Sequence, residues 1–331
     1  MFSGVIRCSS ILIFCAFIAL AQESFSDSGI GGIKATQINI PSYDKKGRLS
    51  WELKASEVES LNGDQLLAKN PILAFYGKQK GGMARSDFGV FDLGNGLAHG
   101  EDTMDITGKG LRASGNGWSF MESSEHGTHQ LSLKNEAQVQ IDGHFDVLFA
   151  GLDKPVRNTL EPTDSSSNSG EPSTNENFPT RAQALNFELL SSEDGGYRLC
   201  FEGNVSVEME GGAHLICEQA EIVISKERNS TSSNDVQLDS IQALGSVHLK
   251  QPGRSVWADE LNWESNQSTV SLLGNARVLD DTWGEAVGET ILLEKGRGRV
   301  RVLGGQKNRS RISLPNIPNF SLPFKSTPSE L

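Results

Sequence analysis

Residues 244–249 read Leu-Gly-Ser-Val-His-Leu, and two further copies of this pattern occur at 201–207 and 273–278. Each copy places a glycine and a small polar residue before two apolar residues that lie one residue apart. Glycine and asparagine adopt turn conformations at low cost, so each copy is interpreted as a turn that opens a strand. The uneven spacing of the copies argues against a strict solenoid and indicates a sheet wound back and forth.

Apolar and polar residues alternate in most segments outward from these copies. The runs Leu49 to Ala55 and Ala137 to Ile141 show this period of two, which predicts strands with one buried face. The 35 glycines supply turns between such strands. Only 55–61 and 180–185 show weak helical patterns. The sequence therefore predicts an all-β, antiparallel protein.

A polar segment divides the chain. Residues 161–177 contain no large apolar side chain, so burial cannot compensate for their ordering entropy. We interpret 153–180 as a disordered linker between a β domain at 30–152 and a second at 181–305, followed by a Pro-rich tail at 306–331. The alternative is a disordered excursion within one continuous sheet.

The first 21 residues have the composition of a secretory signal peptide. Arg7 precedes an apolar run from Ile11 to Leu20, and small residues at Ala19 and Ala21 fit a cleavage site. The run is short for a membrane span, so a retained inner-membrane anchor is the alternative. The protein is predicted to be exported.

If the protein is exported, Cys200 and Cys217 lie in an oxidising compartment, where a disulfide between them could form. They pair in a disulfide or remain two free thiols. If Gly211 and Gly212 form a simple hairpin turn, Val205 lies opposite Cys217, which favours free thiols.

Charge and motifs exclude several function classes. The formal net charge is −12, which argues against a nucleic-acid partner. No short catalytic, cofactor-binding or phosphate-binding motif is present, so we predict neither an enzyme nor a cofactor; a hydrolase on a β scaffold is the remaining enzymatic alternative. His126, His129 and His144 are interpreted as solvated loop histidines rather than metal ligands.

Two further groups of residues have alternative interpretations. Trp257, Trp263 and Trp283 either fill a core or stack sugars. Arg297, Arg299 and Arg301 would share one face of a strand and either contact phosphates or a partner or guard an edge strand.

The repeats resemble the periplasmic lipopolysaccharide-transport proteins of the LptA and LptC (OstA-like) type. The copies at Gly203, Gly245 and Gly274, together with Ala258-Asp259 and Trp263, carry the likeness over 199–305; at Ala213 to Ile222, Glu218 replaces the expected Ala-Asp pair. Residues 43–55 are similar to the opening strands of the LptC relative. The resemblance implies an LptC-like domain fused to an LptA-like domain, each an open jelly roll.

The resemblance also implies a function. Inward apolar residues would form a groove for the acyl chains of lipopolysaccharide, and open edge strands would stack on other transport proteins or on a second copy in the periplasm. The candidate lining residues are Val205, Val207, Leu215, Ile222, Ile224, Val247, Leu249, Leu261, Trp263, Val270, Leu272, Val278, Ile291 and Leu293. The alternative is a structural or carbohydrate-binding envelope protein with closed cores.

Overall fold

The computed structural model describes residues 33–44, 46–62, 64–76, 80–108, 110–123, 128–142, 179–191, 196–226, 236–267, 269–294, 299–305 and 309–314. The predicted signal peptide, nearly all of the predicted linker and most of the predicted tail lie outside these residues.

The described residues form strands that alternate with short turns. The strands before the linker are β1 (Lys34–Tyr43), β2 (Leu49–Asn62), β3 (Gln65–Lys69), β4 (Ile72–Tyr76), β5 (Lys80–Ser86), β6 (Phe88–Asp92), β7 (Leu97–Gly108), β8 (Leu111–Ser123) and β9 (Thr128–Ile141). Those after it are β10 (Thr180–Ala184), β11 (Asn186–Ser191), β12 (Tyr197–Glu208), β13 (His214–Lys226), β14 (Val236–Gln251), β15 (Arg254–Glu264), β16 (Thr269–Asp280), β17 (Gly284–Glu294), β18 (Arg299–Leu303) and β19 (Arg311–Ser313). A short 3-10 turn, η2 (Glu210–Gly212), joins β12 to β13.

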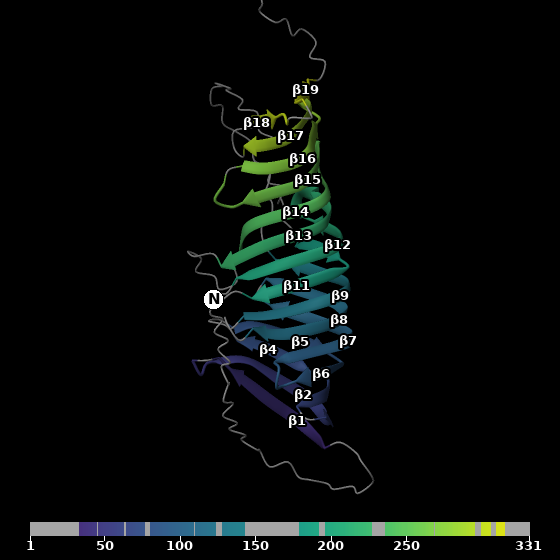
Figure 1. Cartoon of the computed structure of the whole chain (residues 1–331), viewed down its shortest axis with the longest axis vertical. Helices are drawn as coiled ribbons and strands as arrows, with labels where there is room; N and C mark the ends of the chain where they lie inside the picture. Colours follow the sequence, from purple (N-terminus) through teal and green to yellow (C-terminus); the bar gives the residue numbers. More distant parts are fainter. Residues whose placement is uncertain are drawn as a thin grey trace, which may run out of the picture.

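All the described strands belong to one antiparallel sheet, which confirms the predicted fold class at this level. Figure 1 shows them stacked along the long axis, from β1 at one end to β19 at the other. The sheet continues across the predicted linker, because β9 pairs with both β10 and β11. The division into two domains stays a prediction. The helical turns that weak patterns suggested at 55–61 and 180–185 are wrong, since both segments lie mostly in strands.

The sheet folds over along a bend that runs through its long strands. β2 pairs with β4 through residues 51–54 and with β3 through residues 57–62. The same division recurs where β5 and β6 flank β7, where β10 and β11 flank β9, and where β19 and β18 flank β17. We call the layer that contains β4, β5, β10 and β19 the first wall. The second wall contains β3, β6, β11 and β18.

Contacts between distant strands establish that the two walls face each other. Trp51 on β2 and Phe120 on β8 lie four strand-to-strand steps apart, or about 19 Å along a flat sheet, yet their ring centroids are 5.8 Å apart. Tyr197 Oη on β12 donates to the carbonyl of Gly81 on β5 at 3.0 Å, across five steps. We call the side opposite the bend, where these contacts occur, the mouth.

The bend is built from β-bulges at the repeated glycine motif. In β16 the strand register shifts between Leu273 and Ala276, and Gly274 and Asn275 both have positive φ, 69° and 48°. Such a bulge bends a strand while pairing continues on both sides. The expectation that each copy is a turn opening a strand is therefore wrong, because β12, β14 and β16 all run through their copies. Glycine and asparagine suit these two positions because they adopt the left-handed backbone conformation at low cost.

Candidate functional site

The space between the walls is one continuous apolar core. Buried residues from Trp51 to Leu293 form a single cluster that includes strands on both sides of the predicted linker. The fourteen candidate lining residues all belong to it, and each is at most 4% exposed. Their inward orientation is thus as predicted, and their contact with lipid stays a proposal. In this structure they pack against other core side chains rather than facing solvent.

Buried side chains of different sizes line the interior. Small residues stand beside the bulges, among them Ala220, Ala243 and Ala276, all buried. Larger inward residues such as Trp263 and Leu293 stand farther from the bend on the second wall. A large side chain also lies beside a bulge, because the buried Phe201 is directly opposite Ala220.

Acidic side chains cover the bulges from the preceding strand. Asn275 Nδ2 donates to Asp259 Oδ2 at 2.9 Å, and a Cβ placed on Gly274 would collide with Asp259. Glu218 lies over Gly245 in the same way and accepts from Ser246 Oγ at 3.2 Å. The replacement of the Ala-Asp pair by Glu218 therefore keeps the arrangement. These carboxylates hold the bend and do not point into the interior.

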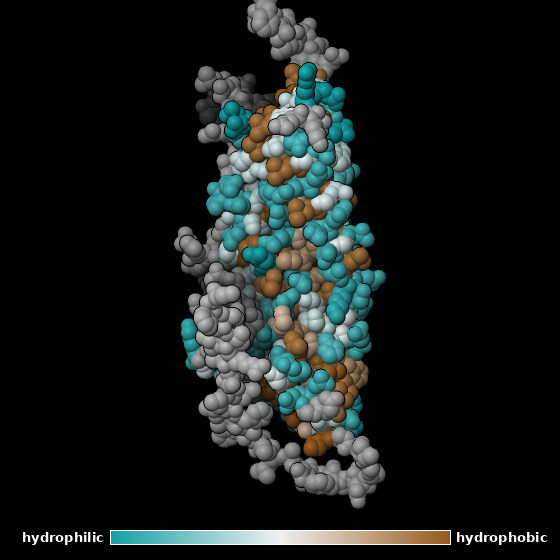
Figure 2. All heavy atoms as spheres, in the orientation of Figure 1, coloured by the Kyte–Doolittle hydropathy of each residue, from teal (hydrophilic) through white to brown (hydrophobic). Residues whose placement is uncertain are grey.

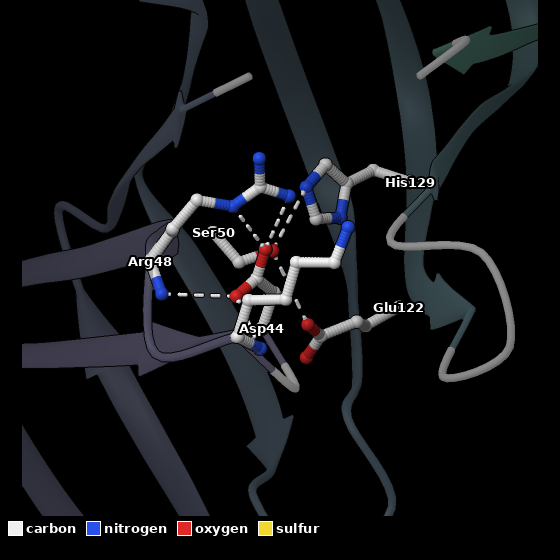
Figure 3. A network of polar contacts seen from close by, with 6 residues as sticks. Asp44, Arg48, Ser50, Glu122 and His129 are labelled. Atoms are coloured by element: carbon white, nitrogen blue, oxygen red, sulfur yellow. Dashed lines mark hydrogen bonds and ion pairs between the residues drawn. The ribbon is translucent and has the colours of Figure 1, made fainter. Parts of the chain in front are cut away.

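Polar side chains of both walls meet at the mouth of the N-terminal part. Trp51 Nε1 donates to Glu122 Oε2 at 2.7 Å, and Ser50 Oγ lies 3.4 Å from both Glu122 Oε1 and His129 Nε2. Figure 3 shows Ser50 of β2 pointing toward Glu122 of β8 and His129 of β9. The adjoining turn is closed by Asp44, which accepts from the backbone N–H of Lys46 and of Arg48.

His129 is not the solvated loop residue that the sequence suggested. It lies in β9, is 8% exposed, and has the rings of Phe75 and Phe120 at 5.7 and 5.8 Å. Burial lowers the pKa of His129, against an opposing effect of the Glu122 charge. Its Nδ1 has no hydrogen-bond partner. The sequence around His129 contains no pattern that predicts its burial. His126 and His144 lie outside the described residues.

The serine, histidine and glutamate of this cluster do not form a hydrolytic triad. In a triad the acid holds the second ring nitrogen of the histidine, whereas Glu122 contacts Ser50 and Trp51, and His129 Nδ1 is unpartnered. Ser50 is also buried. Within the described ranges, no group of three or more His, Cys, Asp or Glu could hold a metal ion.

The two cysteines are free, so the disulfide alternative is corrected. Cys217 lies opposite Val205, as the hairpin argument required, while Cys200 lies opposite Glu221. Four positions along a strand separate the thiols by about 13 Å, well beyond disulfide reach. Cys217 is buried in the interior, where desolvation raises its pKa to about 12.

The tryptophans have core or packing positions. Trp263 is buried, and Trp283 packs against the core. His248 stacks on Trp257 at a centroid distance of 5.0 Å, and Arg277 lies 4.8 Å from its centroid on the neighbouring strand. Because flanking strands cover both faces of Trp257, the ring has no free face for a sugar.

The face of the molecule drawn in Figure 2 is mostly polar. Figure 2 shows hydrophilic side chains over most of the coloured face, with apolar ones scattered. A hollow of ≈ 590 Å³ lies on the outside of the second wall and includes Gln130, Glu188, Gln219 and Gln242 in its lining. It contains none of the candidate lining residues. Across the described part of the chain, no helix is long and apolar enough to cross a membrane.

The predicted arginine face lies on an edge. Arg299 and Arg301 are exposed on β18, while Val300 and Val302 pack against the core. Arg299 Nη1 lies 3.9 Å from Glu294 Oε1. Arg297 lies outside the described residues. The alternation of outward arginines and inward valines is as predicted, and their contact with a phosphate or a partner stays a proposal.

The sequence matches no known family profile and no curated protein. Among solved structures, the chain is similar to LptH, the LptA homologous periplasmic component of the lipopolysaccharide transport device from Pseudomonas aeruginosa. The match has 19% identity and a TM-score of 0.32, and it covers 42% of this chain and 96% of the LptH chain.

Proposed function

We propose that this protein is a non-enzymatic carrier that holds the acyl chains of lipopolysaccharide between its two walls and helps move the lipid across the periplasm to the outer membrane. One observation carries the proposal: a single apolar interior runs through the sheet from β2 to β17 without a break at the predicted linker. Burying acyl chains there would gain about 0.8 kcal/mol per CH₂. The likeness of the glycine repeats to OstA-like proteins supports the same function.

In this proposal, two open jelly-roll domains share one sheet. An LptC-like domain ends at β9 and an LptA-like domain begins at β10, and the pairing of Ala182 with Val139 joins their first walls. Acyl chains would lie along the common interior, among the fourteen candidate lining residues. The predicted signal peptide would place the protein in the periplasm, with a retained inner-membrane anchor as the alternative.

The ends of the sheet provide the proposed partner surfaces. β1 pairs with β2, and β18 and β19 pair with β17, so each of these strands has an edge without a partner strand among the described residues. Exposed Ile33, Tyr43 and Ile312 lie at these ends. Open edges accept further strands, and we propose that they join other lipopolysaccharide-transport proteins or a second copy. Arg299 and Arg301 would contact lipid phosphates or the partner edge.

Binding of three related ligands by the purified protein tests the proposal. The ligands are intact lipopolysaccharide, the same lipopolysaccharide after removal of its acyl chains, and the free polysaccharide. The proposal predicts saturable binding of the intact form only, because the acyl chains supply the driving force. Equal binding of all three would indicate a glycan-binding protein and contradict the lipid function.

A further inference from the structure

The cross-wall contacts at the mouth include polar bonds as well as the aromatic contact of Trp51 with Phe120. At this part of the mouth, polar bonds join Trp51, Ser50 and Ser42 to Glu122. Others join Ser50 to His129 and Tyr197 to the Gly81 carbonyl. All connect strands that lie four or five steps apart in the sheet. They therefore join the walls directly rather than stabilising either wall.

The Ser50 and His129 part of these contacts is incompletely satisfied. Ser50 Oγ lies 3.4 Å from both Glu122 Oε1 and His129 Nε2, near the limit of a hydrogen bond, and His129 Nδ1 is buried without a partner. Water would satisfy every one of these groups if the walls separated. A partly satisfied buried polar network costs free energy in the closed state, so this seam is easier to open than an apolar one.

We infer that the Trp51–Glu122, Ser50–His129 and Tyr197–Gly81 contacts are a latch that closes the mouth of the N-terminal part, and that the walls separate there to admit acyl chains. Opening exposes polar groups at the mouth first, while the bulges keep the walls joined at the bend. That acyl chains are what enters rests on the proposed function. The opening of the mouth does not depend on the proposed function.

Thiol labelling of the full chain measures this opening without lipid. Ala84 is buried on β5, three residues from Gly81, so an Ala84→Cys substitution places a small reporter behind the latch. Peptide mass spectrometry separates its labelling from that of Cys217, which is buried in the C-terminal half and serves as the internal reference. The substituted chain is used provided that its unfolding transition matches that of the parent.

Two tyrosines provide a matched pair of perturbations. Tyr197→Phe removes the cross-wall bond to Gly81, whereas Tyr76→Phe removes a bond of the same 3.0 Å length to Glu52 within the first wall. We expect Tyr197→Phe to speed labelling at position 84 about fivefold, the factor expected for one neutral hydrogen bond, with Cys217 labelling unchanged. Tyr76→Phe should change neither rate. Equal effects of the two substitutions, or no effect of Tyr197→Phe, would overturn the latch.

A lipid measurement on the same variants separates the latch from the proposed function. If the latch admits acyl chains, Tyr197→Phe accelerates association of intact lipopolysaccharide by the same factor as thiol labelling. Faster labelling with unchanged lipid association would contradict the gating inference. Faster labelling in a protein that binds no lipopolysaccharide would leave the latch standing and contradict the proposed function. If Tyr197→Phe leaves labelling at position 84 unchanged in a protein that binds lipopolysaccharide, the result would contradict the latch and leave the proposed function standing.

Discussion

Replacing Gly274 by alanine tests how the repeat builds the bend. The residue has a φ of 69°, and an added Cβ would lie 2.8 Å from Asp259 Cβ and 2.9 Å from Asp259 Cγ. The left-handed conformation alone costs a residue with a Cβ about 1–2 kcal/mol. Displacing Asp259 also breaks its bond with Asn275, which adds about 1–2 kcal/mol. We expect Gly274→Ala to lower the free energy of unfolding by about 2–4 kcal/mol.

Gly211 supplies the matched control for this prediction. It has a φ of 78°, and an added Cβ would meet no atom within 4 Å, so Gly211→Ala should lose only the conformational part, about 1–2 kcal/mol. Urea unfolding followed by tryptophan fluorescence measures both, provided that the slope against urea is unchanged. In an Asp259→Ala background, Gly274→Ala should cost less than in the parent chain, because the carboxylate and its bond with Asn275 are already absent. It should still cost more than Gly211→Ala, because Cβ of residue 259 remains 2.8 Å from the added Cβ. If Gly274→Ala costs no more than Gly211→Ala in the parent chain, the packing of the acid over the bulge does not define the repeat.

Three further predictions concern buried groups. Asp280→Ala should lower the free energy of unfolding by about 3–5 kcal/mol, because it removes the carboxylate 2.6 Å from the buried Arg254 guanidinium; a loss below about 1 kcal/mol in urea unfolding would contradict this. Burial lowers the pKa of His129, so the unfolded chain binds the proton more readily and stability should fall from about pH 7.5 to about pH 5.5. His129→Gln should reduce that fall, and an unchanged pH dependence would refute the assignment. Cys217, whose pKa burial raises to about 12, should react with a thiol reagent at about pH 8 at least about tenfold more slowly than the half-buried Cys200; equal rates by mass spectrometry would contradict its burial.

The period-two alternation predicted the inward face well. A strand with one buried face fixes which side chains point inward, so residues such as Val207 and Leu272 were assigned without knowledge of the topology. The hairpin at Gly211 and Gly212 also fixed a register, which placed Val205 opposite Cys217 and separated the two thiols. The inward face and the hairpin register both depend on residues that are close in sequence, so the local pattern is enough to predict them.

The bend and the mouth were less accessible to prediction. Gly274 and Asn275 have turn composition, and a turn and a bulge within a long strand differ only in whether pairing resumes, which local sequence does not encode. The burial of His129 arises from contacts with Ser50 and Phe75, far away in the chain. Those contacts depend on how far the walls are offset, a consequence of sheet twist accumulated over several strands.

Photocrosslinking in cells tests the central claim, that acyl chains lie between the walls, most directly. A photoreactive side chain at Val207, Leu249 or Leu272 would project into the interior, where all three residues are at most 2% exposed. The neighbouring positions 206, 248 and 271 lie on the opposite face and serve as controls. The account predicts lipopolysaccharide adducts at the three inward positions alone. Adducts at neither set, in a folded periplasmic protein, would contradict it.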